Sequence, residues 1–182
     1  DVAFASQVRI ANHTITLNGS GSLAFAKLYN ENVWSDTTFN SGGWAVNDAG
    51  AVLTIGAFLQ ARGYTFTKSG PGTVVLTGVI DFAYGMNGTT FVSSKINVNG
   101  GTLDVSTATI NLESHLDAGE ALATGATYTL VNYAGGTLAG DAGFTAATGV
   151  PAGWEVAVEA ENRRIVLREI PPAPKETVIL VR

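Results

Sequence analysis

Short alternating runs separated by glycine turns, between Lys68 and Val105, constrain the fold more than any other part of this sequence. Apolar residues recur there at every second position, the spacing of side chains on one face of a strand: Val74, Leu76, Ile96, Val98, Leu103 and Val105. Gly-Pro-Gly at 70–72 and Asn-Gly-Gly at 99–101 supply turn chemistry, and we expect Gly72 and Gly101 to tolerate no β-branched side chain. No interval is long enough for a crossover helix, so the stretch predicts a coil of strands or a sandwich.

The same stretch resembles the autotransporter-associated β-strand repeat. The opening of that repeat is matched by Lys68, Gly70, Gly72, Thr73, Val74, Leu76 and Gly78. Its close is matched by Ile96, Val98, Asn99, Gly101, Thr102, Leu103 and Val105, and its middle is approximated by Tyr84-Gly85 and Gly88-Thr89-Thr90. The resemblance implies a secreted or surface-displayed right-handed parallel β-helix. It marks an architecture rather than a chemistry.

Composition bounds the class of protein. The 182 residues fit one domain, and 46% apolar against 14% charged residues argue for a packed core. A net charge of −5 with scattered basic residues argues against a nucleic-acid partner, which calls for a clustered basic face. There are no cysteines, which excludes a disulfide framework and a thiolate metal site. No apolar run approaches the roughly 20 residues of a membrane-spanning helix.

The first residue and the lack of cysteine both suit an exported protein. The chain opens at Asp1 without methionine, and we interpret it as a mature chain whose signal peptide was removed. An artificial chain boundary would look the same. The predicted location is extracellular or on the cell surface, in a bacterium.

Further alternating runs extend the series of strands along the chain. We expect strands at 51–55, 64–67, 73–77 and 106–116, and at 22–29, where a short helix fits the periodicity equally well and the resemblance favours a strand. Residues 154–158 and 164–167 predict a terminal antiparallel hairpin. A strand spacing of roughly 10 residues gives about six to eight turns of the coil. The predicted fold is therefore all-β with a terminal hairpin. The resemblance implies that it is a right-handed parallel β-helix, and a β-sandwich is the alternative.

The last residues divide the chain into three parts: a β-helix domain at 1–169, a proline-rich linker at 170–176 and an isolated strand at 177–182. The linker contains three prolines, at 171, 172 and 174, and has the composition of an extended spacer. The strand consists of Thr177, Val178, Ile179, Leu180 and Val181. We expect this strand to leave its own domain and pair with a neighbouring copy of the chain. The alternatives are that it folds back onto its own sheet or forms a disordered tail.

Three aromatic residues in a polar segment are the candidate ligand-binding residues. Trp34, Phe39 and Trp44 could stack against a glycan, or they could pack beneath a long loop or at the end of the coil. The second interpretation is favoured, since large aromatic side chains usually dominate core burial.

Other polar residues do not form a catalytic pattern in the sequence. His13 and His115 have no ligand-type partner three or four residues away, and Glu113, Asp117 and Glu120 fit a solvated edge. We therefore expect the protein to have no enzymatic activity, no cofactor and no bound metal. The predicted function is a structural subunit of an extracellular filament or surface assembly, built from copies of the chain. The alternative is an adhesin or passenger module that binds a glycan or a host protein.

Overall fold

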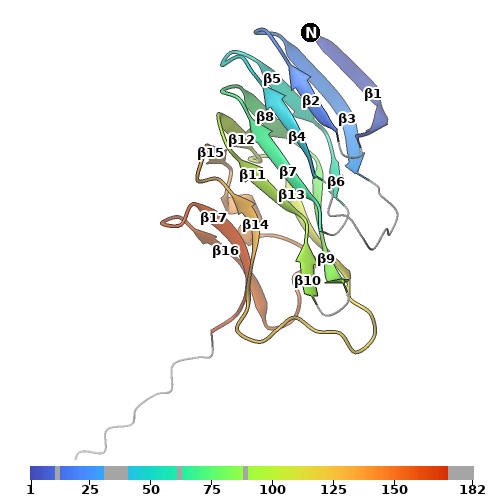
Figure 1. Ribbon diagram of the computed structural model, residues 1–182, viewed down its shortest axis with the longest axis vertical. Helices are drawn as coiled ribbons and strands as arrows, with labels where there is room; N and C mark the ends of the chain where they lie inside the picture. Colours follow the sequence, from blue (N-terminus) through green and yellow to red (C-terminus); the bar gives the residue numbers. More distant parts are fainter. Residues whose placement is uncertain (11–12, 31–40, 61–62, 88–89, 172–182) are drawn as a thin grey trace, which may run out of the picture.

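The computed structural model describes residues 1–10, 13–30, 41–60, 63–87 and 90–171 of the chain. It is an all-β protein with largely parallel sheets, in which 57% of the described residues lie in strands and 3% in helix. The predicted all-β class, with more than half of the residues in strands or tight turns, is confirmed. Figure 1 shows the strands stacked along the long axis of the molecule, with β1 at one end and the last two strands at the other.

The strands form two sheets. The first sheet has 10 strands: β1 (Val2–Arg9), β3 (Ser22–Asn30), β5 (Val52–Ile55), β6 (Phe58–Gln60), β8 (Thr73–Leu76), β9 (Val79–Asn87), β10 (Thr90–Ser93), β12 (Thr102–Asp104), β13 (Thr109–His115) and β15 (Thr137–Ala139). The second sheet has 7 strands: β2 (Thr14–Leu17), β4 (Ser41–Val46), β7 (Thr65–Ser69), β11 (Lys95–Val98), β14 (Thr127–Asn132), β16 (Trp154–Glu159) and β17 (Arg164–Glu169). One short helix, α1 (Ala142–Thr145), precedes β16.

The chain passes repeatedly from one sheet to the other, and most strands pair in parallel with a strand from a neighbouring turn. In the second sheet Ile15 lies opposite Trp44, Trp44 opposite Lys68 and Lys68 opposite Val98, so these turns are 29, 24 and 30 residues long. Repeats of this length lie within the range of solenoid proteins. The turns at 70–72 and 99–101 carry the chain from the second sheet to the first, as the glycine pattern predicts.

Three of the pairings between described strands are antiparallel, and the others are parallel. The three are β9 with β10, β14 with β17 and β16 with β17. The predicted terminal hairpin is confirmed, because Trp154–Glu159 pairs antiparallel with Arg164–Glu169. Immunoglobulin-like and jelly-roll sandwiches are built from antiparallel sheets, so the alternative fold does not fit this pattern.

The core lies between the sheets and is made of inward-facing side chains at every second position. Strands β5, β7, β8 and β11 all alternate between buried and half-buried residues. In the first sheet the parallel register stacks equivalent positions into columns. One column contains Val2, Leu23, Leu53, Val74, Leu103 and Leu138, and a second contains Phe4, Phe25, Ile55 and Leu76. The burial of these columns is the main source of stability in such a stack.

Three details differ from the sequence predictions. Residues 79–87, which separate two recognised parts of the repeat, form the nine-residue strand β9. The helix α1 was not expected, and it buries Phe144 against Phe82, with ring centroids 5.9 Å apart. The second sheet contains five parallel turns in the described residues (β2, β4, β7, β11 and β14), fewer than the expected six to eight, because each turn uses 24 to 35 residues. Residues 22–29 are a strand, as favoured.

Candidate functional site

The candidate ligand-binding aromatics do not form an exposed platform in the described residues. Trp44 lies in β4, and its side chain is completely buried. Its ring packs against Phe58 and Phe66, with centroids 4.8 and 5.0 Å away, and those two rings are 4.7 Å apart. Trp44 is therefore a core residue, which agrees with the interpretation favoured from the sequence. It is removed from the candidate ligand-binding residues, because it offers no ring face to a sugar from solvent. Trp34 and Phe39 lie outside the described residues.

A buried lysine stands out among the polar groups. Lys68 is 0% exposed and occupies an inward position of β7, between Trp44 and Val98 in the parallel register. Its ammonium group donates to the carbonyl oxygens of Ser69 and Gly70, at 3.1 and 2.6 Å. Desolvation by burial lowers the pKa of the Lys68 amine from 10.5 to about 8. A lysine with a lowered pKa can serve as a base or nucleophile, but this amine is sealed from solvent and binds its own turn.

The glycines next to Lys68 allow two turns of the chain to approach closely. Gly101 has a φ of +57°, and a Cβ built there would lie 2.6 Å from the Lys68 Nζ and from the Pro71 carbonyl oxygen. A Cβ on Gly72 would lie 2.5 Å from the Asp48 carbonyl oxygen. Such distances are below any normal Cβ contact, so neither position has room for a side chain. The expectation that both positions exclude side chains agrees with this geometry, although Gly72 does so by close contact rather than by a positive φ.

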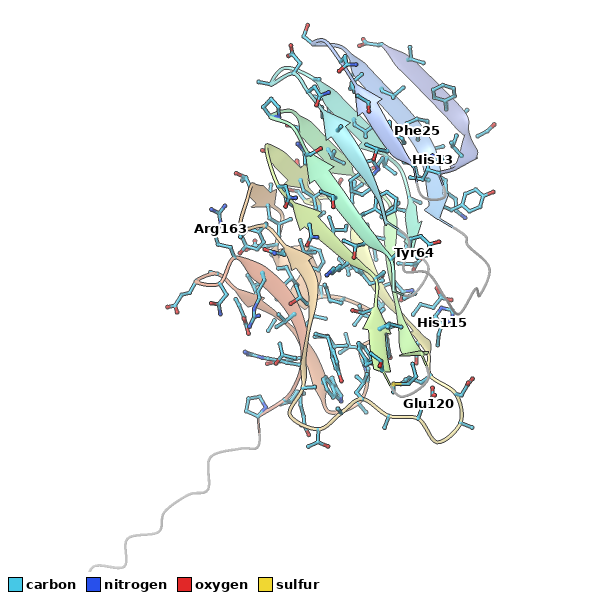
Figure 2. The ribbon with its side chains drawn as sticks, in the orientation of Figure 1. His13, Phe25, Tyr64, His115, Glu120 and Arg163 are labelled. Carbon is cyan, nitrogen blue, oxygen red and sulfur yellow. The ribbon has the colours of Figure 1, made fainter. Side chains whose placement is uncertain are left out.

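The histidines and carboxylates singled out in the sequence have local roles. Figure 2 shows His13 and His115 well apart. The His115 Nε2 lies 3.5 Å from a Glu113 carboxylate oxygen on the surface of β13. Glu120 accepts a hydrogen bond from the Asp117 backbone N–H at 2.8 Å, which closes a turn. Within the described ranges, no group of three or more His, Cys, Asp or Glu residues could hold a metal ion.

One end of the stack is closed by a charged hairpin. Glu155 lies opposite Arg168 and Glu159 opposite Arg164 across β16 and β17, and both pairs form ion pairs. Hydrogen bonds from Arg164 and Asn162 lower the pKa of the Glu159 carboxyl group. Charged residues on an edge strand hinder the addition of further strands. The second sheet is therefore protected at this end, whereas the first sheet ends in the three-residue strand β15, which pairs with β12 alone.

The other end of the stack is open. Among the described strands β1 pairs with β3 alone and β2 with β4 alone, so one edge of each has no strand beside it. Val2 and Phe4 are 55% and 46% exposed, although they belong to columns that are buried further along the stack. Phe4 covers Phe25, with parallel rings 5.1 Å apart, and nothing described covers Phe4 in turn. The core is thus unfinished at this end.

The chain leaves the described part of the molecule beside the hairpin. Strand β17 ends at Glu169, at the predicted domain boundary, and Ile170 donates its backbone N–H to Gly153 at 2.8 Å. An open pocket with a volume of ≈ 460 Å³ lies here, lined by Thr124, Gly125, Ala126, Thr127, Arg168, Glu169, Ile170 and Pro171. The remainder of the linker and the strand Thr177, Val178, Ile179, Leu180 and Val181 lie outside the described residues. Their assignment to subunit binding stays a prediction.

These features define an all-β protein with largely parallel sheets, in which a charged hairpin ends the second sheet and exposed apolar side chains lie at the β1 end. No family model, curated protein or solved structure matches the chain. In the part of the chain that the structure describes, no helix is long and apolar enough to cross a membrane.

Two features of this arrangement were not predicted from the sequence. The burial of Lys68 was missed, although Phe66 and Lys68 stand two residues apart in an alternating run, and this period indicates that both face inward. The exposure of Val2 and Phe4 was missed as well, because the sequence does not show which alternating run is the last of a stack. Parallel pairing supplies that information.

Proposed function

We propose that this protein is a structural subunit of an extracellular filament or surface assembly, joined by β-strand addition of its C-terminal strand to a neighbouring copy. In this proposal the domain is a right-handed parallel β-helix, as the resemblance to the autotransporter-associated repeat implies. The parallel pairing of strands one turn apart supports that finer description of the fold. Copies of the chain are the partners, and no reaction is involved.

One observation carries the proposal: the two ends of the stack differ. The hairpin end presents ion-paired Glu155 and Glu159, whereas the β1 end presents Val2 and Phe4 and an unpaired backbone edge. An exposed edge with apolar side chains is a template for an added strand. A head-to-tail contact between unlike ends repeats without closing unless a rotation closes it, so it favours filaments.

The composition of the C-terminal strand supports the same function. Residues 170–176 in extended form reach roughly 20 Å at about 3.1 Å per residue, enough to cross a subunit boundary. Ordering five residues costs about 5–10 kcal/mol at 1–2 kcal/mol each. Burying Val178 and Leu180 returns about 3–6 kcal/mol, and adding Ile179 and Val181 doubles it. The strand therefore binds stably where both of its faces are covered and its backbone is paired.

Deletion of residues 177–182 tests the proposal. Filaments of the intact protein are counted by negative-stain microscopy, and the folding of the truncated protein is checked by circular dichroism and thermal melting. We expect the truncated protein to melt like the intact subunit and to form no filaments. A full-length control with Val178→Asp and Leu180→Asp keeps the length of the tail and removes its apolar face, and we expect the same loss. Filaments from the truncated protein would refute the proposal.

The adhesin alternative has lost one of its three candidate residues. Trp44 is buried, and Trp34 and Phe39 lie outside the described residues. Binding of the monomeric, truncated protein to a glycan array, together with absence of filaments from the intact protein, would favour that alternative.

A further inference from the structure

We propose that the acceptor for the C-terminal strand is the free edge of β1 in a second copy, where Val178 and Leu180 extend the two core columns that end in Val2 and Phe4. This inference rests on the proposed function, and it adds the identity of the acceptor and the pairing of side chains. The occupant is the segment 177–181, which lies outside the described residues.

The exposed ends of the columns give the first reason. Val2 continues the column of Leu23, Leu53, Val74 and Leu103, in which the last three are 0% exposed. Phe4 continues the column of Phe25, Ile55 and Leu76, which are at most 8% exposed. Each column therefore lacks one further side chain at its β1 end. The two missing positions are two residues apart, which is the spacing of Val178 and Leu180 on one face of a strand.

The backbone edge gives the second reason. From Val2 to Phe4, before the register shift between Phe4 and Gln7, β1 contains no charged residue and no proline, so nothing in this stretch blocks the pairing of another strand. The edge of β16 carries Glu155 and Glu159 instead. The second open edge, β2, has four residues, and its apolar Ile15 and Leu17 are already half-buried against the core. Of these three edges, β1 is the longest and the most apolar.

The length of the linker assigns the acceptor to a different copy. The described chain ends beside β17, and five strand-to-strand steps of the second sheet separate β17 from β2. At about 4.8 Å per step these span roughly 24 Å, and β1 lies further out still. The linker at 170–176 reaches roughly 20 Å, so the strand falls short of its own β1 edge. A second copy whose open end faces the hairpin brings its β1 within reach.

The pairing can be tested without assuming its direction. If Val178 and Leu180 meet Val2 and Phe4 in either order, Ile179 lies opposite Ala3. The chain has no cysteine, so introduced thiols are unambiguous. Ile179→Cys protein is mixed with an equal amount of Ala3→Cys protein, assembled, and treated with a short bismaleimide. Because each chain carries one thiol, a mixed cross-link joins two copies, and mass spectrometry of the linked peptides identifies it.

Two matched mixtures serve as controls, with Thr16→Cys on β2 and Ala157→Cys on β16 in place of Ala3→Cys. We expect the linked peptide between positions 179 and 3 in the assembled protein, its loss when filaments are dissociated, and no comparable link in the control mixtures. The β1 assignment is overturned if filaments require the C-terminal strand but position 179 is cross-linked to position 16 or 157, or to none of positions 3, 16 and 157. The proposed function would remain intact in that case. Filaments that survive deletion of residues 177–182 overturn both.

Discussion

The buried amine of Lys68 predicts an unusual dependence of stability on pH. Its pKa in the folded protein is about 8, against 10.5 for an exposed lysine. Between these values the folded protein has lost the proton while the unfolded chain keeps it, so the free energy of unfolding rises with pH. At roughly 1.4 kcal/mol per pKa unit, the rise amounts to about 3 kcal/mol. Below pH 8 the folded protein carries the full penalty of a buried charge.

The variant Lys68→Met isolates this contribution. Methionine is unbranched and similar in length, so it fills the same space without a charge. At neutral pH its net effect is small, because relief of the desolvation penalty offsets the loss of two hydrogen bonds to carbonyl groups, worth about 1.5–3 kcal/mol each. The diagnostic quantity is therefore the change in unfolding free energy with pH. Lys95→Met, at a half-buried position of the neighbouring strand, controls for the removal of one lysine.

Urea unfolding of the protein lacking residues 177–182, followed by circular dichroism from pH 7.5 to 10.5, measures this slope. We expect the difference in unfolding free energy between Lys68→Met and the parent to change by about 3 kcal/mol in favour of the parent as the pH rises. Lys95→Met should follow the parent. If Lys68→Met and its parent change in parallel over the whole range, the buried, desolvated state of the amine is refuted.

Two further predictions concern packing and the protected end. Gly101→Val and Gly72→Val should each lower the melting temperature clearly. Gly21→Val is the control, because a Cβ at this position has nothing within 4 Å, and it should leave the melting temperature unchanged. Equal melting temperatures for all three variants would contradict the close approach of the turns. Glu159→Gln should lower the melting temperature at neutral pH, and its difference from the parent should vanish in acid as Glu159 of the parent is protonated. Thermal melting of both proteins from pH 7 to pH 2 measures this difference. A constant difference over the whole range would show that Arg164 does not stabilise this carboxylate.

Local pattern predicted the strands well where turns are marked by glycine. Thr73–Leu76 and Lys95–Val98 follow from period two, and the hairpin at Trp154–Glu159 and Arg164–Glu169 follows from two short runs and a polar turn. The pattern failed at Val79–Asn87, because its residues alternate poorly and the strand is defined by its partners on both sides. The number of turns was overestimated for a related reason: two strands of one turn can lie in the same sheet, as β5 and β6 do.

The polar and exposed residues were harder to predict than the strands. Trp44 and Lys68 occupy the same column, yet one is a ring in the core and the other an amine that binds two carbonyl groups. The two side chains differ completely in chemistry, although they occupy equivalent positions in the strand register. For the C-terminal strand, the sequence supplies a composition and the order of features. The acceptor proposed for it rests on the exposure of Val2 and Phe4, which only the stacking of the turns shows.

A stack of parallel turns has two ends, and physical chemistry requires each to be covered or protected if the protein is to stay monomeric. Here the hairpin with Glu155 and Glu159 protects the edge of the second sheet at one end, and its antiparallel pairing breaks the parallel order that another turn would continue. The β1 end retains both the parallel order and the apolar columns. Protection of the hairpin hinders growth at that edge by simple stacking, and in the proposed assembly the C-terminal strand joins the next copy instead. If the proposal is correct, copies add one at a time through the C-terminal strand, rather than by uncontrolled pairing of open edges.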